Sequence, residues 1–154
     1  MNLKIEWDEP INLEYVNNEK LIYQCAPELL PECPGIYVFA RRFGKTHSPI
    51  YVGKASNLRN RITYHFYKNV PLMKGLENAD RGTRIILIGK WISTTGQNME
   101  KALRILEKAY IESALTLGYE LLNIQGTRRA IDKIESSGKK KSHVPFPRRM
   151  NIEK

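Results

Sequence analysis

Apolar and aromatic side chains alternate in the first third of the chain, between residues 35 and 41. An alternation of period two is typical of a half-buried strand. Residues 44–49 contain Gly, Ser and Pro and predict a loop, and the apolar run 50–52 predicts a second short strand. Residues 35–53 therefore predict a β-hairpin.

Two later stretches have the helical period. Ser56 or Asn57 is suited to be the N-cap of a helix that begins near Leu58, because either side chain can accept a hydrogen bond from the first turn. A longer apolar stripe runs from about residue 97 to 117, and Gly118 is suited to end that helix. The sequence predicts one short helix after the hairpin and one long helix near the end.

A third strand is predicted between the two helices. Residues 84–91 are rich in β-branched side chains and are typical of a buried strand, which residues 94–96 interrupt. Residues 68–82 predict a connection with a short helix around 72–79. This order of elements predicts an α+β fold, in which a small antiparallel three-stranded sheet is flanked by helices.

The two ends of the chain differ from its middle. Residues 1–33 predict an acidic N-terminal extension with short strands at 13–16 and 21–24, although a helix is an alternative there. Residues 127–154 have few large apolar side chains and predict a basic, flexible tail. The predicted domain itself covers residues 34–126.

The charge of the 154-residue chain is +9 and is unevenly distributed. Residues 1–34 have a charge of −5, residues 35–76 have +8 and no acid, residues 77–123 are neutral, and residues 124–154 have +6. Two basic segments favour a polyanionic partner, most simply nucleic acid. A basic protein whose charges are only solvated is one alternative, and an anionic membrane surface is a weaker one.

The composition makes other classes of protein improbable. No apolar run approaches the roughly 20 residues that a membrane span needs, and residues 1–7 lack the features of a secretory signal. Cys25 and Cys33 are predicted to be free thiols in a cytoplasmic protein, since a secreted scaffold of this size would carry more cysteines. Without a Cys-x-x-Cys pair, a zinc knuckle is improbable.

Several side chains suited to phosphodiester chemistry lie close together in the acid-free segment. Arg61 and His65 are four residues apart and share one helix face, while Tyr37 and Tyr51 on paired strands can point to one face of the sheet. Each residue alone is most simply a packing or solvated residue. Together with Lys54 they form a set in which a phenol, its pKa lowered by neighbouring cations, takes a proton from water, and the cations stabilise the transition state.

The acid-free segment supplies no metal ligand, but the long helix does. Glu107 lies at the edge of the apolar stripe, where a carboxylate is partly buried. Glu100 lies on the same flank two turns earlier and is the rival candidate, and a solubilising surface acid is the simpler interpretation of Glu107 alone. One carboxylate, completed by water and phosphate oxygens, is an adequate site for one Mg²⁺ or Mn²⁺ ion.

The spacing of these residues resembles that of the GIY-YIG nuclease superfamily, including its excision-repair incision subunit and phage-type members. The triplets that carry the resemblance are Gly35-Ile36-Tyr37 and Tyr51-Val52-Gly53. The resemblance covers residues 34 to about 125, is specific through the hairpin and first helix, and is weaker later. It implies a GIY-YIG-like fold and the hydrolysis of a DNA strand with one divalent ion.

The resemblance also implies a role for each matching residue. One tyrosine would activate water, directly or through the histidine, while the arginine and the lysine would stabilise the pentavalent phosphorus. The glutamate would hold the cation, and the asparagine would support the site. The implied catalytic set is Tyr37, Tyr51, Lys54, Arg61, His65, Glu107 and Asn123, with Glu107 as the metal ligand.

DNA is the predicted partner, contacted mainly through phosphates, because no motif for reading bases is present. A non-catalytic nucleic-acid-binding module with the same fold is the alternative, and residues 1–33 are a candidate surface for a protein partner or for self-association. The predicted nucleic-acid contacts are Arg41, Arg42, Lys45, Arg59, Arg128, Arg129, Lys139, Lys140 and Lys141.

Overall fold

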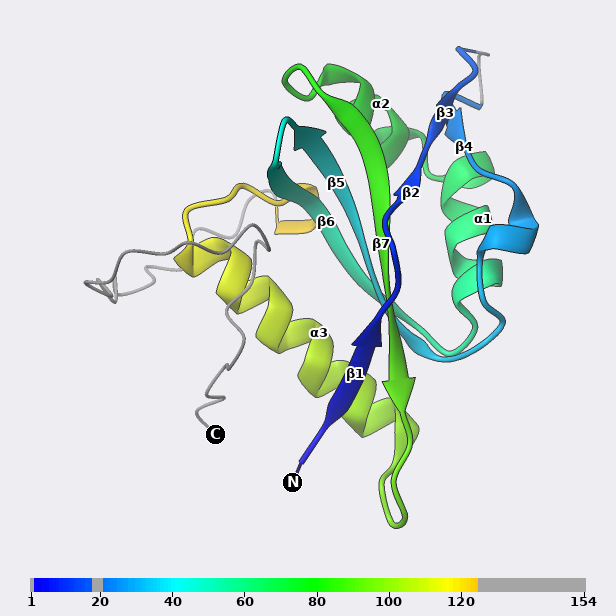
Figure 1. The fold of residues 1–154 in the computed structure, drawn as a ribbon, viewed down its shortest axis with the longest axis vertical. Coiled ribbons are helices and arrows are strands. Elements are labelled where there is room, and N and C mark those ends of the chain that lie inside the picture. Colours follow the sequence, from blue (N-terminus) through cyan, green and yellow to red (C-terminus); the bar gives the residue numbers. More distant parts are fainter. Residues whose placement is uncertain (1, 18–20, 125–154) are drawn as a thin grey trace.

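The computed structural model describes residues 2–17 and 21–124 (Figure 1). Its order of elements matches the predicted one, with additional short strands near the N-terminus. The elements are β1 (Lys4–Trp7), β2 (Ile11–Asn12), β3 (Glu14–Tyr15), β4 (Tyr23–Gln24), the 3-10 helix η1 (Pro27–Leu29), β5 (Gly35–Phe43), β6 (Thr46–Ala55), α1 (Leu58–Lys68), α2 (Val70–Asn78), β7 (Thr83–Ile92), α3 (Met99–Thr116) and the 3-10 helix η2 (Leu122–Ile124).

The main sheet is antiparallel and has five strands, not three. Its order is β1-β7-β5-β6, and β2 also pairs with β7. The predicted α+β class is confirmed, and the difference in strand number comes from residues 4–12, which pair with β7 as two short strands. The acidic N-terminal segment is thus partly built into the sheet.

The hairpin of β5 and β6 is longer than predicted. Phe43 pairs with Thr46, so only Gly44 and Lys45 form the turn, and the expectation of a loop over 44–49 was wrong. Gly44 has a φ of 61°, a conformation that favours glycine and permits so short a turn. A bulge after Phe39 then shifts the register, so that Ala40 pairs with Pro49.

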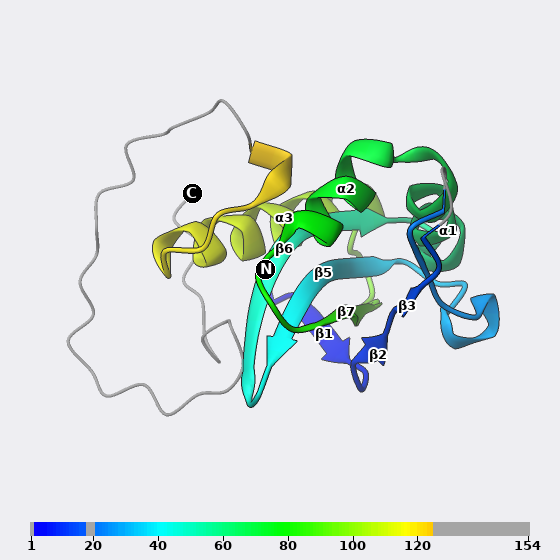
Figure 2. The ribbon, with the colours of Figure 1, turned by 90° about the horizontal axis from the view of Figure 1, so that it is seen from above.

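Helices cover both faces of the sheet. The odd positions of β5, Tyr37 and Phe39, belong to the core that includes side chains of α1 and α2. The even positions, such as Ile36 and Val38, belong to a second core with side chains of α3. Figures 1 and 2 show α1 on one side of the molecule and α3 reaching to the other, and Figure 1 shows α2 close to α1. The alternation seen in the sequence is therefore an alternation between two buried layers.

In the part of the chain that the structure describes, an asparagine side chain caps the start of each of the three α-helices. Asn57, rather than Ser56, caps α1 by accepting a hydrogen bond from the backbone N–H of Asn60 at 3.1 Å. Asn69 and Asn98 cap α2 and α3 in the same way. Gly118 follows the end of α3 with a φ of 91°, as its predicted role requires.

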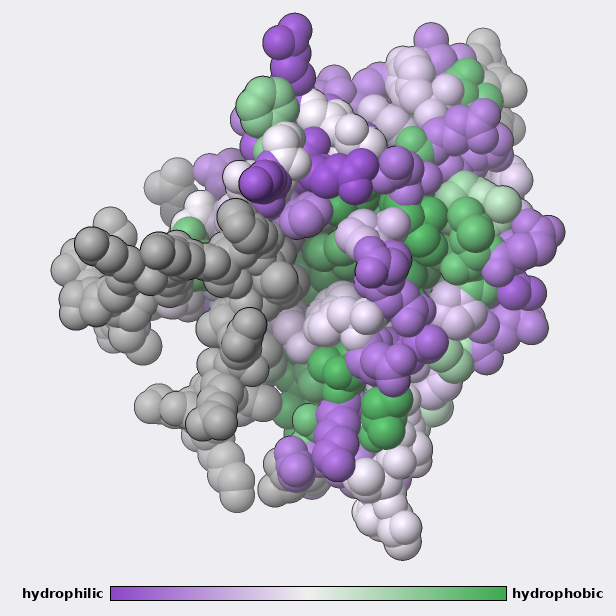
Figure 3. Space-filling model, viewed as in Figure 1, coloured by the Kyte–Doolittle hydropathy of each residue, from purple (hydrophilic) through white to green (hydrophobic). Residues whose placement is uncertain are grey.

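Part of the N-terminal segment also packs against α1. Leu13, Ile22 and Leu30 are buried in the core shared with that helix. The backbone N–H of Leu58 donates to the carbonyl of Cys33 at 3.0 Å, which attaches the chain before β5 to the start of α1. Figure 3 shows several apolar patches on the face crossed by β1 and β2, with hydrophilic residues between and around them.

The two cysteines are free, as predicted, and both are half-buried. Burial raises the pKa of the Cys25 thiol to about 11. Within the described residues, no helix is long and apolar enough to cross a membrane.

Candidate active site

The candidate site lies at the free edge of β6, where side chains from both layers meet. Tyr37 and Tyr51 come from β5 and β6, and Arg61 and His65 come from α1 on the same face. Glu107 comes from α3, which packs on the opposite face. The structure therefore brings side chains from both layers to one edge of the sheet.

Gly53 explains how Tyr37 can reach this edge. Tyr37 pairs with Gly53 in the antiparallel register. A Cβ atom at position 53 would collide with the ring and hydroxyl of Tyr37. The phenol ring thus lies across β6 only because residue 53 has no side chain, which is a physical reason for glycine in the second triplet.

The buried Tyr37 and His65 and the partly buried Tyr51 form an aromatic cluster. The hydroxyl of Tyr37 lies 2.6 Å from Nε2 of His65, and both side chains are almost fully buried. The rings of Tyr37 and Tyr51 are stacked, with centroids 6.3 Å apart. The expectation that the two tyrosines share a face is thus consistent with the geometry, and α1 places His65 over them.

The pKa values of the two phenols differ from the expectation. Burial raises the pKa of Tyr37 well above its usual range, and the neighbouring Tyr51 raises it further. Burial also raises the pKa of Tyr51. Arg61 lowers both pKa values but does not offset burial. The expectation of a lowered phenol pKa was therefore wrong for the protein alone, because loss of solvent outweighs one nearby cation.

His65 is neutral near pH 7. Burial, followed by repulsion from Arg61, lowers the pKa of its imidazole to about 4. Its Nδ1 lies 2.9 Å from Nδ2 of Asn69, which was not among the predicted site residues. The local signal was an asparagine four residues after a helical histidine, a spacing that brings two side chains together.

Glu107 and Asn123 hold the outward-facing backbone of β6. The backbone N–H of Lys54 donates to the Glu107 carboxylate. Nδ2 of Asn123 donates to the carbonyl of Val52 at 2.8 Å. Residues two apart in a strand direct their backbone groups to the same side, so both contacts cap the free edge.

The electrostatic environment distinguishes Glu107 from its rival Glu100. Glu107 is half-buried, and burial raises its pKa, against the charges of Lys54 and Arg61 and the Lys54 hydrogen bond. Glu100 is exposed and lines a hollow of about 600 Å³ together with Lys54, Arg61 and Tyr64. Among the described residues, no group of three or more His, Cys, Asp or Glu side chains is arranged to hold a metal.

Comparison with known protein families decides the assignment. Residues 33–114 match the family described as the UvrC-like GIY-YIG domain. The chain belongs to this family. The match includes both triplets, α1 and Glu107, so the GIY-YIG domain of this chain contains the candidate site except for Asn123.

The GIY-YIG domain is also similar to parts of larger proteins. The UvrABC system protein C of Porphyromonas gingivalis is 48% identical over 58 residues, which are 38% of this chain and 8% of that protein. The protein of the same name from Neisseria meningitidis is 36% identical over 96 residues, which are 60% of this chain and 13% of that protein. The chain thus spans only a small part of these relatives.

Two solved structures are similar to this GIY-YIG domain. Both are Tyr-to-Phe point mutants of the GIY-YIG N-terminal endonuclease domain of UvrC from Thermotoga maritima, bound to the catalytic divalent cation. They are 28% and 29% identical to this chain, each with a TM-score of 0.41, and each match covers 58% of this chain and 84% of the other.

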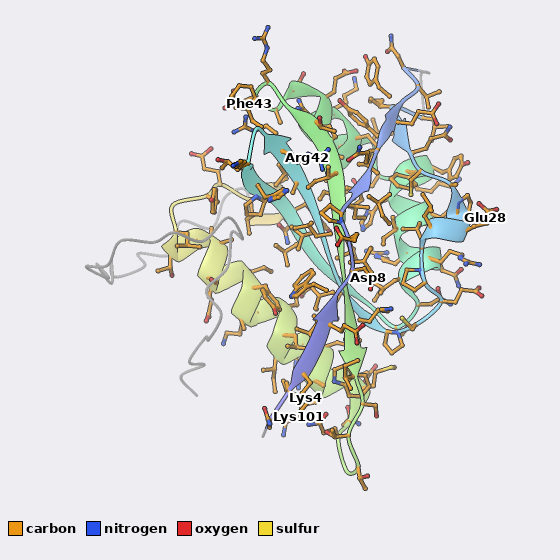
Figure 4. The ribbon with its side chains drawn as sticks, viewed as in Figure 1. Lys4, Asp8, Glu28, Arg42, Phe43 and Lys101 are labelled. Carbon is orange, nitrogen blue, oxygen red and sulfur yellow. The ribbon has the colours of Figure 1, made fainter. Side chains whose placement is uncertain are left out.

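Among the predicted nucleic-acid contacts that lie in the described residues, Arg41 lines the same open hollow as Glu107 and Asn123. Arg41 donates a hydrogen bond to the carbonyl of Arg81, and Arg42 donates one to Oδ1 of Asn12. Figure 4 shows Arg42 at one end of the molecule and Lys101, near the start of α3, at the other. Arg41 is roughly 13 Å along β5 from Tyr37 at about 3.3 Å per residue. Lys45 is exposed in the turn of the hairpin.

Arg59 is held within the protein. Its Nε donates to the carbonyl of Leu30 at 2.9 Å, and its Nη1 lies 3.5 Å from Glu32. It attaches α1 to the segment before β5, so its guanidinium is already engaged. The remaining predicted contacts, Arg128, Arg129, Lys139, Lys140 and Lys141, lie outside the described residues.

Proposed function

We propose that this chain is a metal-dependent DNA endonuclease that hydrolyses phosphodiester bonds at the free edge of β6. The observation that carries the proposal is the position of Arg61, whose charge acts on Tyr37, Tyr51 and Glu107 alike. Proton acceptors, a cation and a carboxylate thus meet around one point at which a phosphate can be bound. Membership in a GIY-YIG family supports this function.

The residues of the chain divide the reaction between them. Arg61, which is exposed, and Lys54 stabilise the negative charge that develops on the phosphate oxygens. Tyr37 or Tyr51 takes the proton of the attacking water. Since Arg61 opposes the effect of burial on both phenols, it also favours the phenolate that this step needs. Asn123 keeps β6 in position through Val52.

Glu107 would hold the divalent cation, either Mg²⁺ or Mn²⁺. A single half-buried carboxylate fits an ion that keeps several waters and takes its other ligands from the substrate. The bond from the Lys54 backbone orients the carboxylate against the edge of the sheet. When bound, such an ion supplies Lewis-acid stabilisation of the phosphate charge.

DNA is the proposed substrate because the segment around the site is strongly basic. The eight Lys and Arg residues between 35 and 76 are accompanied by no acid. Arg41, Arg42 and Lys45 would contact phosphates farther along the strand, as would the basic segment after residue 127. Such contacts give affinity that falls steeply with salt and depends little on sequence.

A nicking assay tests this function. The full chain is incubated with supercoiled plasmid and with nicked, branched and single-stranded DNA, with Mg²⁺ or Mn²⁺ and with EDTA. We expect cleavage only with metal, and a loss on the order of 100-fold or more for Arg61→Ala and for Glu107→Ala. The matched control is Glu112→Ala, because Glu112 is an exposed acid of the same helix, 4.0 Å from Lys108.

Two results would contradict the proposal. Cleavage that persists in both variants would show that another site, or a contaminant, is responsible. Tight, salt-sensitive DNA binding without cleavage under either metal would instead identify the chain as a non-catalytic nucleic-acid-binding module.

A further inference from the structure

Asn69 connects the end of α1 to the start of α2 and also contacts the buried histidine. Its backbone N–H donates to the carbonyl of His65 at 3.2 Å, which closes the last turn of α1. Its Oδ1 accepts a hydrogen bond from the backbone N–H of Leu72 at 3.2 Å, which caps α2. Its Nδ2 lies 2.9 Å from Nδ1 of His65.

These contacts leave one orientation for the Asn69 amide. The backbone N–H of Leu72 can only donate, so the amide oxygen must face it. The amide nitrogen, which also only donates, must then face His65. The reversed amide would place two donors against each other at Leu72 and would lose the helix cap.

The orientation of Asn69 determines the tautomer of His65. Nδ1 of His65 accepts from Asn69 and therefore carries no proton. A neutral imidazole has one donor and one acceptor nitrogen, so its proton is on Nε2. This Nε2 lies 2.6 Å from the hydroxyl of Tyr37, which must accept the hydrogen bond.

We propose that Asn69 is a positioning residue that fixes His65 as a hydrogen-bond donor to Tyr37, so that His65 stabilises negative charge on Tyr37 and does not take its proton. The inference rests on the proposed nuclease function and narrows it. Donation to a phenol oxygen favours the phenolate. Of the two routes by which water can lose its proton, the route through His65 is closed, and a tyrosine acts on the water directly.

The tautomer is measured without any cleavage assay. The full chain, labelled with ¹⁵N in its three histidines, is studied by long-range ¹H–¹⁵N NMR at pH 8.5, and the His65 signals are assigned by their loss in His65→Gln. We expect a protonated Nε2 and an unprotonated Nδ1. A protonated Nδ1 in the unaltered chain would overturn the proposal.

Asn69→Asp tests the role of the amide. Aspartate keeps an oxygen for the Leu72 N–H and is an equally good N-cap, but it presents an acceptor to Nδ1 in place of a donor. We expect the proton of His65 to move to Nδ1 and cleavage to fall on the order of 10-fold to 100-fold, since a wrong histidine tautomer can cost far more in other enzymes. Thermal stability should stay close to that of the unaltered chain.

Asn98→Asp is the matched control, because Asn98 caps α3 through Lys101 with the same geometry and is distant in the chain from His65. Its cleavage rate should be unchanged. A variant Asn69→Asp that keeps the original tautomer, or that changes it without loss of cleavage, would overturn the role of Asn69. If the tautomers behave as expected but no substrate is cut, the hydrogen-bond assignment stands and the nuclease proposal fails.

Discussion

The two edges of the central three-stranded unit β6-β5-β7 are closed in different ways. At the β7 edge, β1 and β2 satisfy the backbone with strand pairing, from Lys4 opposite Ile92 to Asn12 opposite Ile85. At the β6 edge, side chains satisfy the backbone. Glu107 accepts a hydrogen bond from the backbone N–H of Lys54, and Asn123 donates one to the carbonyl of Val52. An edge closed by strands is only structural, whereas an edge closed by side chains is protected from pairing and still accessible to a substrate.

The largest effect at the β6 edge is expected from Gly53→Ala. The new methyl group would displace the Tyr37 ring, with which it collides, and a displacement of about 1 Å can cost on the order of 100-fold in rate. We therefore expect single-turnover cleavage to fall by about 100-fold or more, while circular dichroism shows a folded protein. Cleavage at the original rate would show that the position of Tyr37 is not critical.

The second prediction concerns pH and the buried His65. Its folded pKa of about 4 lies below the ordinary value of 6.5, so the unfolded chain binds more protons between these values. The contribution of neutral His65 to the free energy of unfolding is thus complete above pH 6.5. The free energy of unfolding should fall by roughly 3 kcal/mol as the pH drops to 4. Urea titrations at several pH values measure this loss.

His65→Gln is the control for the pH prediction. This variant has no imidazole to protonate, so its free energy of unfolding should depend less on pH between 6.5 and 4. An equal dependence in both proteins would mean that other groups cause the loss, and that the pKa of His65 is not strongly lowered.

The smallest effect is expected at the opposite edge, from Trp7→Ala. Trp7 of β1 makes an edge-to-face contact with Tyr110 of α3, with ring centroids 5.3 Å apart, and is 36% exposed. Its loss should lower the free energy of unfolding by about 1–2 kcal/mol and leave the cleavage rate of the folded protein unchanged. A loss of cleavage as large as that of Gly53→Ala would show that the two edges are not independent.

Local patterns predicted the elements that carry most of the site. β5 is buried on two faces and α1 is buried on one face. Each kind of burial gives a periodic pattern of side chains that is visible in the sequence. The position of Glu107 at the margin of an apolar stripe likewise predicted its half-burial. The identity of the residues in the two triplets then gave the family, which the match over 33–114 confirmed.

Features that depend on distant pairing could not be predicted in this way. Strands as short as β1 and β2 have no periodicity of their own, and they form because β7, some eighty residues later, offers an edge. The raised phenol pKa values depend on burial by several elements at once. Asn69 was missed because its role comes from three simultaneous hydrogen bonds, of which only the four-residue spacing is visible in the sequence.

The topology also gives the site an order of assembly. The hairpin and α1 lie within thirty-four consecutive residues, 35–68, and local contacts of this kind form quickly in folding. Glu107 and Asn123 reach β6 only when the chain closes a loop of more than fifty residues, which is entropically costlier and slower. A nascent or partly unfolded chain is therefore expected to bring the tyrosines and Arg61 together before Glu107 arrives, so that the proposed hydrolysis would begin only with the completed fold.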